Sequence, residues 1–152
     1  MQVPYGLLIL ALALAPAAAG GCHLAPMGIA GGVGKLGDVS VAFGAADHAL
    51  HPTAWQGPLR ITTGSAPACT VSDEVAIVEA PVALGGGILY VPTYSGGNNR
   101  LYAVATKSCR VLWRSHPFTG PTRPGNGRLT IGGRRVPLDR QCHPAGMAGD
   151  GR

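Results

Sequence analysis

The chain has 152 residues, of which 46% are hydrophobic and 12% are charged, and its formal net charge is +5. This length corresponds to about one domain, so it allows one small core and excludes a large multidomain enzyme. It contains 24 Gly and 13 Pro; within a helix Gly costs about 1 kcal/mol and Pro about 3 kcal/mol relative to Ala, so the composition disfavours helices over most of the chain.

The charge is unevenly distributed. Residues 1–99 carry a net charge of −3, and residues 100–152 carry +8. A basic C-terminal part could attract phosphates, anionic lipid or an acidic partner. Its arginines stand singly among Gly and Pro, without a basic helix or an aromatic platform. We therefore expect an ordinary solvated surface and no nucleic-acid partner.

The N-terminal segment is apolar. The run Leu7–Leu14 is unbroken and is too short to cross a bilayer as a helix of about 20 residues. It is typical of a signal-peptide core, although Met1–Gly6 contains no Lys or Arg. We predict a helical signal peptide over residues 1–21 and export to an oxidising or periplasmic compartment; the alternative is a buried or interfacial helix that is never cleaved.

Two processing routes fit this segment. Ala17-Ala18-Ala19 offers the small residues that an ordinary signal peptidase needs. Ala19-Gly20-Gly21-Cys22 resembles a bacterial lipobox, although Ala19 stands where Leu is usual. By that resemblance Cys22 would be lipidated and would attach the chain to the membrane.

The remainder predicts an all-β domain. Residues 22–37 lack a sustained period and are expected to be a Gly-rich tether, residues 38–142 a β-domain, residues 115–127 a loop within it, and residues 143–152 a disordered tail. Short β-rich runs punctuated by Gly predict the strands, which are Val39–Phe43, Leu59–Thr63, Val75–Val78, Val82–Leu84, Ile88–Val91, Leu101–Val104, Leu129–Ile131 and Arg134–Leu138. The last two predict a hairpin with a Gly132-Gly133 turn, and Pro137 confines its second strand to a sheet edge.

One segment has a recognisable pattern. Ala80-Pro81-Val82-Ala83 and Gly87-Ile88-Leu89-Tyr90-Val91 are followed, after a Gly-rich turn, by Leu101-Tyr102-Ala103-Val104 and Val111-Leu112-Trp113. This Ala80–Trp113 segment resembles the blade repeat of quinoprotein-like (PQQ-like) β-propellers. The resemblance implies that Tyr90, Tyr102, Ala103 and Trp113 pack between blades, the alanine allowing close approach and the indole filling the gap between sheets.

The segment also departs from the family. Ala105, Ser108 and Cys109 stand where the repeat has Asp, Thr and Gly. Propellers need at least about four blades of roughly 40 residues each, more than this chain can supply after a signal peptide. We therefore expect partial, propeller-like sheets of short antiparallel strands: a fragment, a subunit whose ring closes by association, or a β-domain with one borrowed blade. A second copy could lie at Val39–Trp55.

Four cysteines occur, at positions 22, 69, 109 and 142. Cys69 and Cys109 lie one blade length apart, so we favour a disulfide between them; reduced, buried cysteines are the alternative. Cys22-His23-Leu24-Ala25-Pro26-Met27 and Cys142-His143-Pro144-Ala145-Gly146-Met147 share the pattern Cys-His-x-Ala-x-Met. Thiolate, imidazole and thioether suit soft copper, although chance repetition is the better explanation of the pattern.

Other chemistry is poorly supported. Asp47, His48 and His51 could form part of a hydrolytic triad, but no Gly-x-Ser-x-Gly elbow accompanies them. Quinoprotein dehydrogenases hold their quinone beside calcium, often with vicinal cysteines, and this chain has no adjacent cysteines and few acids. We predict no catalytic residues, no metal ligands and no bound cofactor, while PQQ or copper stay possible.

The sequence therefore predicts an exported, non-catalytic β-propeller-type binding or assembly scaffold at the bacterial envelope. Its partner would be another protein or the blades that complete the ring. One alternative is a truncated or accessory piece of a PQQ-dependent redox enzyme; another is a small copper-binding exported protein.

Overall fold

The computed structural model describes residues 21–147, and the predicted all-β class is confirmed. None of the described residues is helical, so none lies in a helix able to cross a membrane. The predicted signal peptide falls almost entirely outside the described residues. Within residues 21–147, fifteen short strands form three antiparallel sheets. The strands are β1 (Ala25–Pro26), β2 (Gly28–Ala30), β3 (Val33–Leu36), β4 (Val39–Ala42), β5 (Ala54–Trp55), β6 (Arg60–Thr63), β7 (Cys69–Thr70), β8 (Val78–Glu79), β9 (Ala83–Gly85), β10 (Ile88–Thr93), β11 (Arg100–Ala105), β12 (Val111–Arg114), β13 (Thr122–Gly125), β14 (Arg128–Ile131) and β15 (Arg134–Pro137).

The N-terminal sheet has the order β2-β3-β4-β6-β7. It corrects the expectation of a tether at residues 22–37, because β1, β2 and β3 all lie in that range. The range has no long apolar run, yet Ile29 and Leu36 pack against the core that this sheet covers. Each of these three strands has at most four residues, and glycines interrupt them. The sequence therefore shows no sustained alternation of apolar and polar residues in this range.

The central sheet contains the segment that resembles a propeller blade. Strands β9, β10, β11 and β12 form a four-stranded meander, extended by β1 at one edge and by β8 with β5 at the end of β10. All six residues of β10 are buried, because sheets lie over both of its faces. A continuous apolar run is what such a doubly covered strand needs.

The C-terminal sheet has the order β13-β14-β15. The predicted Gly132-Gly133 hairpin is present, and β15 is an edge strand that ends at Pro137. The loop expected over residues 115–127 is wrong in part, since it contains β13. The expected tail is wrong over residues 143–147, where Pro144 forms a bridge with Leu138; residues 148–152 lie outside the described part.

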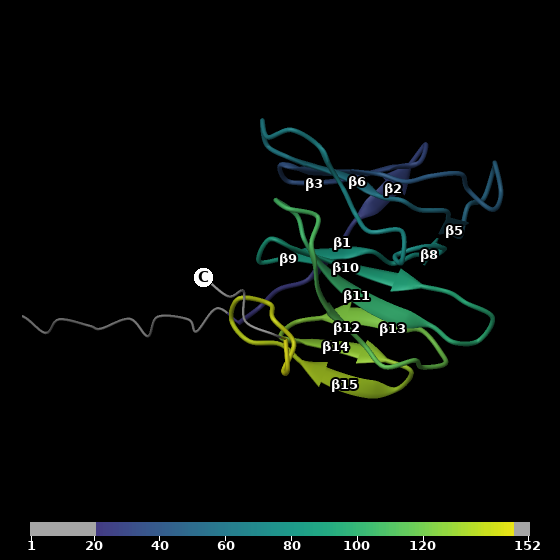
Figure 1. Ribbon diagram of the computed structural model, residues 1–152. Helices are drawn as coiled ribbons and strands as arrows, with labels where there is room; N and C mark the ends of the chain where they lie inside the picture. The colour runs from purple at the N-terminus through teal and green to yellow at the C-terminus, as the bar shows by residue number, and fades with distance from the viewer. Residues whose placement is uncertain (1–20, 148–152) are drawn as a thin grey trace, which may run out of the picture.

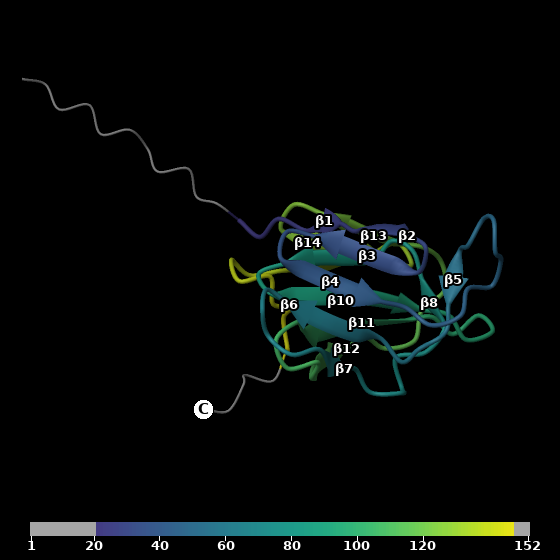
Figure 2. The ribbon, with the colours of Figure 1, turned by 90° about the horizontal axis from the view of Figure 1, so that it is seen from above.

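The three sheets are stacked face to face (Figure 1). Figure 2 looks onto the N-terminal sheet and shows β4 and β6 lying over β10 and β11. One apolar core lies between the N-terminal and central sheets and includes Val41, Ile61 and Leu89. A second core lies between the central and C-terminal sheets and includes Tyr90, Leu101 and Leu129.

The structure contradicts a second blade copy at Val39–Trp55. Trp55 does not belong to the N-terminal sheet; it pairs with Val78 and so extends the central sheet. The partner of β4 is instead β6, with Val41 opposite Ile61. The position of Trp55 after a strand therefore did not identify a repeat, because β5, which contains it, joins the central sheet, and β6, the partner of β4, begins only at Arg60.

Candidate functional site

The arginines that look scattered in the sequence are gathered by strand register in the C-terminal sheet. Arg123 on β13 pairs with Thr130 on β14, and Thr130 pairs with Arg135 on β15. Arg128 lies two residues before Thr130 on the same strand. Paired residues point to the same side of a sheet, as do residues two apart on one strand. Arg123, Arg128 and Arg135 therefore surround Thr130 on one face, which we call the arginine face.

This face points away from the rest of the stack. Leu129 and Ile131, which alternate with Arg128 and Thr130, are buried in the second core, and Val136 packs against it. Arg123, Arg128 and Arg135 are all exposed. The C-terminal sheet stands at one end of the stack, so its outer face meets solvent (Figure 1).

The electrostatics of the arginine face are uniform. Residues 115–138 contain no Asp or Glu. The ion pairs found among residues 21–147 are Arg114 with Glu74 and His143 with Asp139, and neither involves the three arginines of this face. Three guanidinium groups that make no ion pair among residues 21–147 produce a local positive potential that attracts anions.

The turn before β15 sets the register that builds this face. Gly132 and Gly133 have φ values of 52° and 78°, the left-handed conformation that a two-residue type I′ hairpin turn requires at both positions. The turn places Ile131 opposite Arg134 and hence Thr130 opposite Arg135. A shift of one residue would move Arg135 to the core side.

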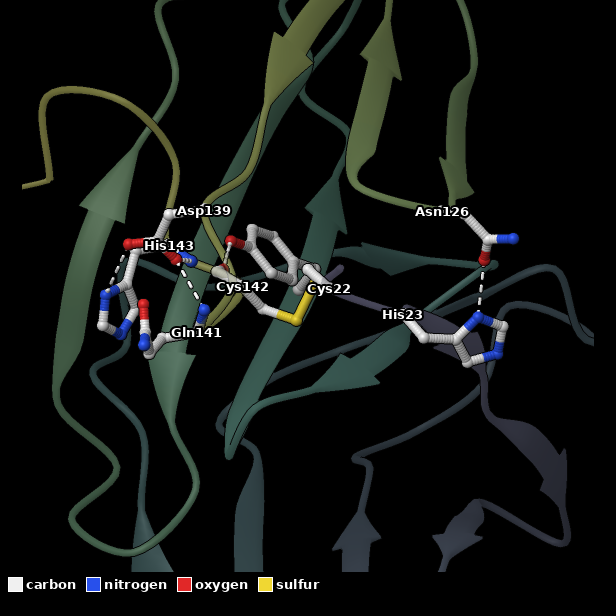
Figure 3. The surroundings of a disulfide bond; sticks show 8 residues. Cys22, His23, Asn126, Asp139, Gln141, Cys142 and His143 are labelled. Atoms are coloured by element: carbon white, nitrogen blue, oxygen red, sulfur yellow. Dashed lines mark hydrogen bonds and ion pairs between the residues drawn. A yellow bond between two sulfur atoms is a disulfide. The ribbon is translucent and has the colours of Figure 1, made fainter. Parts of the chain in front are cut away.

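A disulfide between Cys22 and Cys142 anchors both ends of the described domain beside the C-terminal sheet (Figure 3). The sulfur atoms are 2.05 Å apart, and the two cysteines are separated by 120 residues. Both are buried. Gly85 lies against this bond, because a Cβ there would be 2.9 Å from Cys142 Sγ. The backbone thus leaves space for the disulfide inside the second core.

Hydrogen bonds hold the Cys142 turn in place. The Tyr90 hydroxyl donates to the Cys142 carbonyl oxygen, and Asp139 Oδ1 accepts hydrogen bonds from the backbone N–H groups of Gln141 and His143 at 2.9 and 2.8 Å. Burial, with a smaller contribution from the charge of Asp139, raises the pKa of Tyr90 above its usual range. This tyrosine therefore stays neutral and acts as a structural hydrogen-bond donor.

The lipid expected on Cys22 and the Cys22–Cys142 bond are mutually exclusive. A thioether to lipid and a disulfide need the same Cys22 sulfur, and the structure has the disulfide. Cys69 and Cys109, the pair favoured from the sequence, are also joined, with an S–S distance of 2.09 Å. This second bond links β7 of the N-terminal sheet to the turn between β11 and β12. Among residues 21–147 no cysteine is free.

The two copies of Cys-His-x-Ala-x-Met do not converge as a copper site. Their cysteines are bonded to each other, so neither offers a thiolate. Figure 3 shows His23 and Asn126 on one side of the disulfide and Asp139 with His143 on the other. Met27 is buried in the first core. No cluster of three or more His, Cys, Asp or Glu suited to a metal is found in the described part of the chain.

Asp47 stabilises its own loop, residues 47–54, through hydrogen bonds. Asp47 Oδ1 accepts the backbone N–H groups of His48, Thr53 and Ala54, and Asp47 Oδ2 accepts the Thr53 hydroxyl at 2.6 Å. These bonds, the Thr53 hydroxyl first, lower the pKa of Asp47 far below its usual range. Its carboxylate accepts three backbone N–H groups and the Thr53 hydroxyl, and no hydrogen bond joins it to His51 in the described part of the chain.

The expected packing residues lie on two faces of the central sheet. Tyr90, Ala103 and Trp113 are directly opposite one another across β10, β11 and β12 and face the C-terminal sheet. Tyr102 points the other way and packs in the first core. Trp113 is half-buried at the margin of the second core.

Several hollows border these elements. One of about 650 Å³ lies along the C-terminal turn, beside Leu112, His143 and Met147. Another, of about 210 Å³, is lined by Trp113, Phe118 and Val136, with Arg134 and Arg135 also contributing.

The arginine face was missed from the sequence, although one signal was present. That signal is the Gly132-Gly133 turn, because a two-residue turn at this position implies that Thr130 pairs with Arg135. Arg123 could not be added because residues 115–127 were expected to be a loop.

No family model matches the chain, and neither the curated proteins nor the solved structures contain a significant match.

Proposed function

We propose that the chain is an exported, non-catalytic β-propeller-type scaffold that binds a partner at the bacterial envelope. The observation that carries this proposal is the pair of disulfides, Cys22–Cys142 and Cys69–Cys109. Structural disulfides form and persist in oxidising compartments and are rare in a reducing cytosol. The apolar run Leu7–Leu14 supplies the matching export signal.

The two outer faces of the stack of sheets carry charged residues, which supports a scaffold to which no further blade is added. At one end is the arginine face, and at the other the N-terminal sheet presents Lys35 and Arg60, which are exposed and alternate with core residues of the same strands. A further blade would bury these charges at a high cost in desolvation. Terminal units of stacked proteins carry such polar outer faces. The partner is therefore one that contacts a polar surface rather than a missing blade.

The test is to express the full chain in a bacterium and locate it by fractionation, with thiol alkylation under denaturing conditions to count free cysteines. We expect export with all four cysteines oxidised. Replacing Leu10 and Leu12 by Arg interrupts the apolar run and should retain the chain in the cytosol with reduced thiols. A wild-type chain that stays cytosolic, reduced and folded would overturn the proposal.

A further inference from the structure

The arginine face has a geometry that can be stated from its register. Arg123 and Arg135 both pair with Thr130, one from each side. Arg128 is the diagonal neighbour of each, a relation that places side-chain origins about 7–8 Å apart. The exposed guanidinium groups carried by these side chains repel one another weakly in water, and an anion held between them relieves that repulsion. The face is therefore most favourable when it is covered by negative charge.

Its remaining side chains restrict what can cover it. On the same face, Arg128 pairs with Gly125 on β13 and with Pro137 on β15. The residues that neighbour the arginines on this face therefore have small side chains. Thr130, Gly125 and Pro137 offer no aromatic ring on which a base could stack, whereas single-stranded nucleic acids are bound through such stacking. The 210 Å³ hollow near β15 is lined by Trp113 and Phe118 of the core side, and Arg134, Arg135 and Pro137 of the edge strand β15 also border it.

We propose that the arginine face docks on the surface of a membrane rich in anionic phospholipid. Three exposed guanidinium groups on one face complement the closely spaced phosphates of an anionic bilayer surface, and guanidinium binds phosphate oxygens through paired hydrogen bonds. This inference rests on the proposed function, because only an exported scaffold at the envelope meets such a surface from the outside. It replaces covalent anchoring through Cys22, whose sulfur is in a disulfide.

The experiment measures partition of the oxidised full chain onto sedimenting vesicles. One set contains phosphatidylcholine alone, and the other contains phosphatidylcholine and phosphatidylglycerol. The neutral vesicles report any binding by the apolar N-terminal run, so the difference between the two sets isolates the electrostatic contribution. We expect stronger partition onto the anionic set, weakening as salt is raised because the arginines are exposed and screened.

The test variant is R123Q/R135Q, and the matched control is K35Q/R60Q, which removes the same charge from the opposite end of the stack. Each arginine near an anionic surface contributes about a fivefold gain in partition. We therefore expect R123Q/R135Q to bind anionic vesicles about 25-fold more weakly, with binding to neutral vesicles unchanged. The control should change by less than about twofold, and both variants should keep the wild-type unfolding midpoint.

Three results would overturn the inference: no preference of the wild type for anionic vesicles, an equal loss in both variants, or a loss of binding to heparin or duplex DNA in R123Q/R135Q without a loss on vesicles. The last would mean that the face binds soluble polyanions. An exported, oxidised chain with no preference for anionic vesicles would remove this inference alone, whereas a cytosolic, reduced chain would remove the proposed function.

Discussion

The Tyr90 hydroxyl donates a hydrogen bond to the Cys142 carbonyl oxygen, so the middle of β10 is tied to the turn that carries the C-terminal disulfide. The two residues are 52 positions apart, and both are buried. The bond thus couples the central sheet to the element that closes the domain.

Replacing Tyr90 by Phe should lower the free energy of unfolding by about 1–3 kcal/mol, because the buried Cys142 carbonyl would lose its donor. Urea denaturation measures the loss. Tyr102→Phe is the matched control, since Tyr102 is equally buried and its hydroxyl has no hydrogen bond among the described residues. A comparable loss in both variants would contradict the role assigned to the Tyr90 bond.

The same tyrosine gives a pH dependence. Its pKa is raised in the folded state, while an unfolded tyrosine ionises near about pH 10. Its contribution to stability is therefore complete below about pH 10 and is lost as the pH rises beyond that value. We expect the wild type to lose stability between pH 9 and 12 more steeply than Tyr90→Phe, as measured by thermal unfolding across this range.

The two disulfides should differ in their contributions to stability. Cross-linking residues 120 apart removes more unfolded-state entropy than cross-linking residues 40 apart. On that basis C22A/C142A should lose about 5 kcal/mol and C69A/C109A about 4 kcal/mol. Chemical denaturation of the two double variants tests the order, and a larger loss for C69A/C109A would contradict it.

Glu79 should destabilise the protein at neutral pH. Burial raises its pKa in the folded state, so the folded state favours the protonated form. Its favourable contribution is present below the unfolded pKa of about 4 and is lost as the pH rises through the raised value. Glu79→Gln should therefore be more stable than the wild type at pH 7, and the gain should disappear by about pH 4. Equal gains at both pH values would rule out ionisation as the cause.

Ala103 should not tolerate a larger side chain. It is fully buried and stands directly between Tyr90 and Trp113 in the register of the central sheet. Ala103→Leu should cost about 1–3 kcal/mol, because added volume strains a packed core. Ala105→Leu, two residues along the same strand and only half-buried, should cost less. Thermal unfolding of the two variants compares them, and a similar loss in both would argue against tight packing at Ala103.

Sequence reasoning found the features that depend on local pattern. The Gly- and Pro-rich composition predicted an all-β chain, the apolar runs at β10 and β11 predicted strands, and Gly132-Gly133 predicted the β14–β15 hairpin. Each follows from propensity or turn chemistry within a few residues. The tether at residues 22–37 was wrong because its strands are too short, and too rich in glycine, to show a period.

The amino-acid sequence by itself determined which residues could form strands and turns in this protein. The tertiary structure decided which residues meet. The Cys22–Cys142 bond, the position of Trp55 and the gathering of Arg123, Arg128 and Arg135 all depend on how strands distant in sequence pair and stack. The Gly132-Gly133 turn fixes the register of β14 against β15. Burial of Leu129 and Ile131 against the central sheet decides which face of this hairpin meets solvent, so charges that are isolated in the chain come together on one exposed face only in the folded protein.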